Sequence, residues 1–165
     1  MRCLIRDHRF NQKIGDRFAN PRGSMSGAFE KSTVVQVTHQ TRIHFADIME
    51  EARAWQKRRG SEGWNYPFND AWMLPRIERS ELFLTYFENE PVAAFRLLWE
   101  DRPFWADRET GDCIYLHTFA VRRDRAGCGI GEGVIERVAA IGREENRQNI
   151  RLDCSLSSAK TDLIL

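Results

Sequence analysis

The chain has 165 residues, 42% of them hydrophobic, which is enough for one domain with a sizeable core. Its 25 lysine and arginine residues nearly balance 24 aspartate and glutamate residues, which excludes the overall positive field that binds nucleic acid non-specifically. The four cysteines have no CxxC or CxxH spacing, so we expect no metal site and no disulfide framework, and a cytoplasmic location.

The first part of the chain has charges spread through it and no continuous apolar run, so it matches neither a secretory signal nor a membrane span. It also lacks a helical or strand period, and Met25 offers an alternative start. We therefore expect residues 1–32 to be a poorly ordered N-terminal extension, followed by a single domain over residues 33–165.

The predicted elements begin with a strand around residues 34–38, where β-branched residues cluster. An amphipathic helix follows, with apolar residues at spacings of three and four from Phe45 to Trp55 and Gly60 as its stop. A short helix is expected over residues 69–78, with a proline in its middle. Two strand-like runs, "ELFLTYF" and "PVAAFRLLW", are joined by "ENE" and should pair as an antiparallel hairpin.

The second half of the chain opens with "CIYLHTFAV", which is apolar or aromatic at nearly every position, as is typical of a central strand covered on both faces. The stretch "RAGCGIGEG" follows directly. A helix of about four turns is predicted from Glu132, with Val134 and Val138 on its apolar face, and "IRLDC" then indicates another buried strand.

The glycine-rich stretch lies in the order strand, turn, helix, which offers a phosphate group several backbone amides, little side-chain bulk and the positive end of a helix. A Walker loop is excluded because Gly131 is followed by Glu132 and Gly133 with no lysine. A dinucleotide fingerprint is excluded because Glu132 or Val134 stands where glycine or alanine is needed.

With its flanks, the stretch resembles the acyl-CoA loop of the GNAT superfamily of N-acetyltransferases. "FAVRRDRAGCGIG" supplies the small residue and valine that end the strand, Ala120 and Val121, and the glycines Gly129 and Gly131. "IRLDC" resembles the superfamily's fifth strand, and the two hairpin runs resemble its second and third. The resemblance covers roughly residues 33–154 and implies an α/β (α+β) fold, with a single mixed, mostly antiparallel central sheet flanked by helices.

The sequence departs from the superfamily pattern in two places. Ala126 stands where relatives have arginine or glutamine. After "IRLDC" the chain reads "SLSSAKTDLIL", with Ser158, Ile164 and Leu165 near the expected asparagine and tyrosines, so no general-acid tyrosine is carried over. We therefore expect a C-terminally truncated member that lacks the last helix and strands, with an open sheet edge that favours a homodimer.

The resemblance implies direct transfer of an acetyl group from acetyl-CoA to a primary amine of a small molecule or peptide, with no metal and with no nucleic-acid or membrane partner. The alternative is a non-catalytic or inactive acyl-CoA-binding remnant of the same fold. A nucleotide-binding module of another fold is a weaker third interpretation, because its lysine and spacing are missing.

The resemblance also implies where acetyl-CoA binds, namely on backbone amides at the start of the helix, with Arg125 ahead of Arg122 and Arg123 as a source of positive charge. The alternative is a tight turn without a ligand. The predicted cofactor-binding residues are Phe119, Ala120, Val121, Arg125, Ala126, Gly127, Cys128, Gly129, Ile130 and Gly131.

Two catalytic groups are predicted. By analogy, the backbone amide of Val121 polarises the thioester if the strand separates from its neighbour there. Strand alternation places Tyr115, His117, Phe119 and Val121 on one face, and His117 is the candidate base because an imidazole exchanges a proton near neutral pH. A structural histidine is an equal alternative, and a water chain ending on Glu100 or Asp112 could do the same task.

The acceptor amine is predicted to contact aromatic residues. The predicted substrate-binding residues are Trp64, Tyr66, Trp72 and Tyr115. Core packing is the favoured alternative for the first three, which cluster with Phe68, and also for Trp99 and Trp105 beside the polar loop. Asp153 is expected to be structural.

Overall fold

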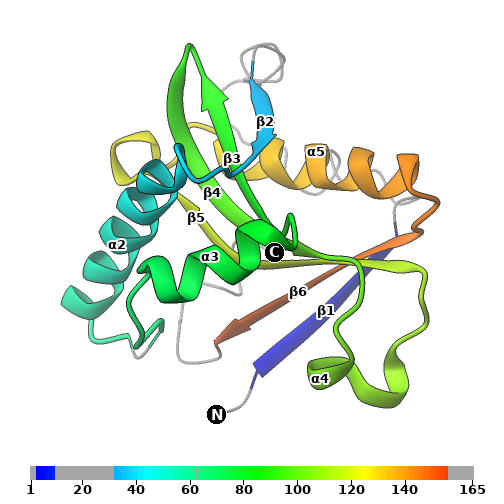
Figure 1. Ribbon diagram of the computed structural model, residues 1–165. Helices are drawn as coiled ribbons and strands as arrows, with labels where there is room; N and C mark the ends of the chain where they lie inside the picture. Colours follow the sequence, from blue (N-terminus) through cyan, green and yellow to red (C-terminus); the bar gives the residue numbers. More distant parts are fainter. Residues whose placement is uncertain (1–2, 10–31, 62, 156–165) are drawn as a thin grey trace.

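The computed structural model describes residues 3–9, 32–61 and 63–155, which form one six-stranded mixed sheet with helices on both faces (Figure 1). The strand order is β1-β6-β5-β4-β3-β2, and neighbours are antiparallel except for β5 and β6, which are parallel. The strands are β1 (Cys3–Arg9), β2 (Thr33–Gln36), β3 (Leu82–Phe87), β4 (Glu90–Leu98), β5 (Cys113–Val121) and β6 (Asn149–Ser155). The predicted fold class, a mostly antiparallel mixed sheet flanked by helices, is confirmed.

Within the described residues, three helices cover the sheet. α2 (Arg42–Arg58) and α3 (Asp70–Glu78) lie on one face, and α5 (Ile130–Glu144) lies on the other (Figure 1). Each turns an apolar side inward, so that Met49 of α2 and Val138 of α5 have no exposed surface. Each strand and helix predicted after residue 33 is present.

Local backbone preferences explain two of the turns. Glu88 and Asn89 join β3 to β4 with φ of 52° and 66°, the left-handed pair that a two-residue hairpin favours. α3 begins after Asn69, whose side chain accepts a hydrogen bond from the backbone N–H of Trp72. Pro75 lies inside this helix, which stays short at nine residues.

The segment between β4 and β5 holds two short helices that the sequence did not predict, α4 (Arg102–Trp105) and η2 (Ala106–Arg108). Trp105 is only 3% exposed and packs with Cys113 and Tyr115 at the beginning of β5. This packing fixes the segment against the sheet, so its side chains have defined positions beside β5.

Residues 3–9 correct two predictions. They were expected to belong to a poorly ordered extension, but they form β1, and all seven pair antiparallel with β6, from Cys3 opposite Ser155 to Arg9 opposite Asn149. The expected open edge of β6 is therefore also wrong, because β1 satisfies its backbone groups. Local periodicity does not reveal such a pairing, since the partner lies at the far end of the chain. Residues 1–2 and 10–31 of the predicted extension lie outside the described residues, as do Ser158, Ile164 and Leu165.

Among the helices of the described ranges, none has the length and apolar composition needed to cross a membrane.

Candidate functional site

β5 and β6 separate halfway along β5. Their parallel ladder begins with Cys113 opposite Asn149 and ends with Leu116 opposite Leu152, although both strands continue, β5 to Val121 and β6 to its pairing with β1. In Figure 1 the two ribbons diverge beyond this point. The sheet therefore splits beside the second half of β5.

The backbone N–H of Val121 points toward this split. The next residue, Arg122, donates its N–H to the carbonyl of Val92 at 2.9 Å, and Val121 lies opposite Ala93. In an antiparallel ladder, hydrogen-bonded and non-hydrogen-bonded pairs alternate, so the Val121–Ala93 pair is of the second kind. The amide of Val121 thus faces away from β4, toward the side of β5 where β6 no longer pairs with it.

The loop after β5 is shaped by two left-handed glycines. It passes through η3 (Arg123–Arg125) and reaches α5 through Gly127 and Gly129, with φ of 78° and 75°. Gly129 is the N-cap of α5 and has no side chain to cover the end of the helix. These conformations are costly for other residues, which explains why glycine occurs at both positions.

The amides at the start of α5 are the ones directed outward. The first helical hydrogen bond runs from the N–H of Gly133 to the carbonyl of Gly129, so the amides of the three residues before Gly133 precede the helical ladder. In contrast, the N–H groups of Ala126 and Cys128 donate to carbonyls within the turn. Among the backbone amides predicted to bind acetyl-CoA, those nearest the helix therefore have the geometry of an anion site.

Some of the predicted cofactor-binding residues turn apolar side chains into the core. Phe119 and Ile130 belong to the apolar cluster under α5, and Ala120 belongs to the cluster on the opposite face. Only their backbones line the split. A Cβ added to Gly131 would lie 3.9 Å from the side chains of Phe119 and Val121, so this glycine sits directly above the end of β5.

The three arginines of the loop differ in their surroundings. Arg122 lies 3.5 Å from Asp124, and the guanidinium of Arg123 lies 4.1 Å from the centre of the Trp55 ring of α2. Arg123 thus ties the loop to α2. Arg125, the preferred charge donor, is exposed at the tip.

A β-bulge corrects the predicted face of β5. Thr118 has a φ of 50°, and the register shifts there, because Ala94 lies opposite Ala120 whereas Arg96 lies opposite His117. His117 consequently lies on the face opposite α5, with Tyr115, while Phe119 and Val121 pack toward α5. The expectation that all four share one face is wrong, because strict alternation fails across a bulge.

His117 lines a pocket of about 380 Å³ on the face opposite α5. Its Nε2 atom lies 3.2 Å from Oδ2 of Asp101, and the two side chains are 15% and 12% exposed. The ring stacks parallel to Tyr115 and meets Phe104 edge-on. The pocket is lined by Arg96, Leu98, Asp101, Pro103, Phe104 and His117.

Tyr115, predicted to contact the acceptor, has no exposed surface. Its hydroxyl donates to Glu109 at 2.6 Å and accepts from Arg151 at 3.1 Å, and burial followed by the bond to Glu109 raises its pKa. Burial acts to raise the pKa of Glu109, but hydrogen bonds from the Asp101 and Gly111 amides and from Tyr115 together lower it. Tyr115 therefore supports the segment that carries Asp101 instead of touching a ligand.

The other three residues predicted to contact the acceptor amine form an aromatic cluster between α2 and α3, in which the degree of burial differs. Trp72 stacks on Phe45 of the core at 6.1 Å and on Tyr66 at 6.0 Å, while Trp64 and Tyr66 each meet Phe68 edge-on. Phe68 is buried, Trp64 and Trp72 are half-buried, and Tyr66 is exposed. The favoured packing interpretation describes the inner members, whereas Tyr66 presents a ring to solvent.

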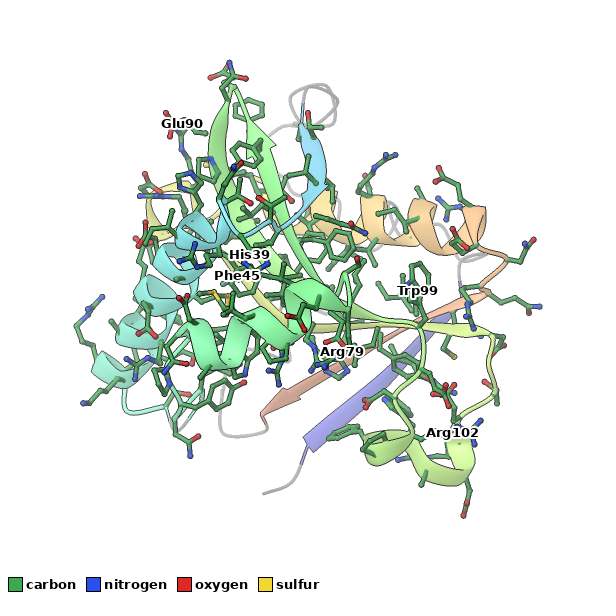
Figure 2. All side chains as sticks on the ribbon, viewed as in Figure 1. His39, Phe45, Arg79, Glu90, Trp99 and Arg102 are labelled. Carbon is green, nitrogen blue, oxygen red and sulfur yellow. The ribbon has the colours of Figure 1, made fainter. Side chains whose placement is uncertain are left out.

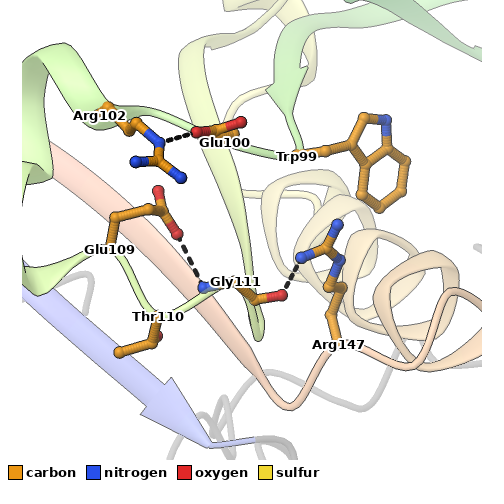
Figure 3. A pocket seen from close by; sticks show the side chains of 7 residues that line it. All are labelled: Trp99, Glu100, Arg102, Glu109, Thr110, Gly111 and Arg147. Atoms are coloured by element: carbon orange, nitrogen blue, oxygen red, sulfur yellow. Dashed lines mark hydrogen bonds and ion pairs between the residues drawn. The ribbon is translucent and has the colours of Figure 1, made fainter.

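A second pocket, of about 360 Å³, lies beside the beginning of β5 and the end of α5 (Figure 3). Arg147 bonds the carbonyl of Gly111 there, and Glu100 pairs with Arg102. Glu100 therefore lines this pocket and not that of His117.

Asp112, the other candidate carboxylate, is held by Thr110 and Asn149. Trp99 lines the second pocket, and Trp105 is buried as the packing interpretation expects.

Asp101 and Arg96 were not among the site residues predicted from the sequence. Asp101 stands in a polar loop next to the weighed Glu100, and only the folded loop shows which carboxylate reaches His117. Arg96 had a sequence signal, since it is the one charged residue within "PVAAFRLLW". The described residues bring together no group of three or more histidines, cysteines or carboxylates suited to a metal ion, and the side chain of Asp153 lies outside the described residues.

Comparisons with known proteins give the same assignment for most of the chain. A model of the acetyltransferase (GNAT) family matches residues 46–161. An uncharacterised N-acetyltransferase, YesJ, of Bacillus subtilis (strain 168) is 32% identical over 114 residues, which are 63% of this chain and 62% of the relative. The chain thus matches less than two thirds of that relative's length.

Solved structures share the fold. An acetyltransferase of the GNAT family from Listeria monocytogenes 4b F2365 is similar with a TM-score of 0.66 at 23% identity, over 81% of this chain and 82% of that one. One from Streptococcus agalactiae 2603 has a TM-score of 0.64 at 13% identity, over the same shares of the two chains.

Proposed function

The chain belongs to the acetyltransferase (GNAT) family, and from this premise we propose that it transfers an acetyl group from acetyl-CoA to a primary amine of a small molecule or peptide by direct attack. The observation that carries the proposal is the split between β5 and β6, where the Val121 amide and the glycine-capped start of α5 face the same opening. A family member that keeps this geometry keeps the means to hold and polarise a thioester.

The residues present fit acetyl-CoA. Gly129 leaves the end of α5 uncovered, so the amides of Ile130, Gly131 and Glu132 are the proposed partners of the pyrophosphate. Exposed Arg125 adds positive charge at the rim of the loop. When bound, acetyl-CoA supplies the activated acetyl group as a thioester.

The proposed chemistry needs two further groups from this chain. The N–H of Val121 stabilises the negative charge that develops on the carbonyl oxygen. His117 takes the proton that the amine loses as its nitrogen bonds to the acetyl carbon and the carbon–sulfur bond breaks. Asp101, whose Oδ2 lies 3.2 Å from Nε2, orients the imidazole.

The volume of the His117 pocket, about 380 Å³, suits a small amine or the end of a peptide, since ligand pockets run from roughly 300 to 1,000 Å³. A cytoplasmic location and a homodimer remain predictions. The pairing of β1 with β6 removes the open edge that was the reason to expect the homodimer.

Release of free CoA from acetyl-CoA, followed with a thiol reagent across a panel of primary amines, tests the proposal. We expect amine-dependent release of CoA. Gly129→Glu should abolish it, because the new carboxylate places negative charge beside the amides that bind the pyrophosphate. Gly111→Glu is the matched control, since Gly111 also has a positive φ, of 73°, but lies at the other end of β5. Binding of acetyl-CoA without turnover would favour the non-catalytic alternative instead.

A further inference from the structure

Arg96 is the cross-strand neighbour of His117. The two residues lie directly opposite each other on β4 and β5, and both side chains line the same pocket. Opposed residues on neighbouring strands have Cβ atoms about 5 Å apart. A ligand that reaches His117 therefore also meets a guanidinium.

Glu81 uses only part of the donor capacity of this guanidinium. Glu81, 12% exposed, accepts from Nε and Nη2 of Arg96 at 2.8 and 2.7 Å. The N–H groups of Nη1 and the second N–H of Nη2 are not used by Glu81, and a pair of donors from two nitrogens forms the fork that suits an anion.

Positive charge is in excess behind the pocket. Glu81 also bonds Arg79 at 2.5 Å, and Arg76 lies close enough that the charges of Arg96 and Arg79 add to burial in lowering its pKa, while Glu81 opposes this. Arg76 stacks on Trp72 at 4.1 Å, and its buried Nε has no hydrogen-bond partner among the described residues. One carboxylate thus faces three arginines. Figure 2 shows Arg79 just beyond α3, on the face of the sheet that α2 covers.

We propose that the acceptor amine carries an anionic group, a carboxylate or a phosphate, which Arg96 binds while the amine faces His117 and Asp101. The inference rests on the proposed function and names the substrate class of the same site. A single small molecule spans both groups, because Arg96 and His117 are adjacent across the sheet.

Matched pairs of acceptors test this inference. Alanine is compared with alaninamide, and O-phosphoethanolamine with ethanolamine, both by kcat/KM for acetyl transfer and by calorimetric binding to the full chain. We expect the anionic member of at least one pair to be favoured by about tenfold or more, and the favoured pair shows whether the group is a carboxylate or a phosphate. Equal affinity within both pairs, or no binding of either anionic amine, would overturn the inference.

Variants of the two arginines that share Glu81 localise the effect. Arg96→Gln should erase the preference, while Arg79→Gln, whose side chain is 55% exposed and lies outside the pocket lining, should leave it intact. Arg96→Lys keeps the charge for Glu81 and should reduce the preference without loss of folding. A preference that survives in Arg96→Gln and Arg96→Lys contradicts the assignment. If no amine is acetylated but anionic amines bind through Arg96, the proposed function fails, and with it the acceptor role of these amines, while the anion site at Arg96 stands.

Discussion

Asp101 lies beside His117 on the wall of a pocket, with Oδ2 3.2 Å from Nε2 and both side chains at least 85% buried. The carboxylate comes from the loop after β4, and the imidazole comes from the middle of β5, beside the bulge at Thr118. This pair gives the pocket an imidazole with a fixed orientation.

Replacement of His117 by alanine should lower kcat by about 10²- to 10⁴-fold, the usual contribution of a general base. An imidazole must be neutral to accept a proton, so the wild-type rate should fall at low pH and that dependence should disappear in the variant. Rate profiles between pH 5.5 and 9, roughly, make the comparison. If the rate and its profile stay unchanged, His117 is a packing residue.

Asp101→Asn tests the positioning of the imidazole. It should lower kcat by about tenfold or more and change KM for acetyl-CoA little, because the carboxylate touches the base and not the loop at α5. Asp101→Glu, which restores the charge, should recover part of the rate. An unchanged kcat in Asp101→Asn would remove Asp101 from the mechanism.

Glu109→Gln should destabilise the chain near neutral pH by about 1–3 kcal/mol, because Glu109 accepts hydrogen bonds from Tyr115 and two backbone amides. The folded pKa of Glu109 is lowered, so its stabilisation is present above the ordinary value of 4.5 and is lost as pH falls through the folded value. Thermal unfolding at neutral and acidic pH should therefore show a smaller acid-induced loss in the variant. An equal loss in both proteins would refute this assignment.

Removal of residues 1–9 should lower the melting temperature by about 5 °C or more, because it deletes β1 and leaves the outer edge of β6 unpaired. An exposed edge also favours association, so light scattering should detect larger species. A monomer that melts at the wild-type temperature would show that β1 adds nothing to the fold.

The sequence predicted the longer helices and the strands from β2 to β6 because their periodicity is local. The run from Cys113 to Val121 and the amphipathic α5 each carry their own signal. β1 was missed because its partner is β6, and only long-range pairing makes those seven residues a strand. Strand alternation likewise could not place His117 and Phe119 on opposite faces, since threonine gives no warning of the positive φ at Thr118.

The sequence predicted the part of the candidate site that depends on backbone conformation, which is the glycine turn before α5. Gly127 and Gly129 do have left-handed φ values, as a glycine-rich turn into a helix suggests. Asp101 and Arg96 were not found, because each reaches His117 across space from a different part of the chain. Tyr115 was predicted to contact the acceptor, but its hydroxyl forms hydrogen bonds with Glu109 and Arg151 inside the protein.

Calorimetric titration of the purified chain with acetyl-CoA, with ATP and NAD as controls, tests the central claim most directly. The account predicts selective binding of acetyl-CoA that Gly129→Glu removes and Gly111→Glu leaves intact. A folded chain that binds acetyl-CoA no better than ATP or NAD would contradict it.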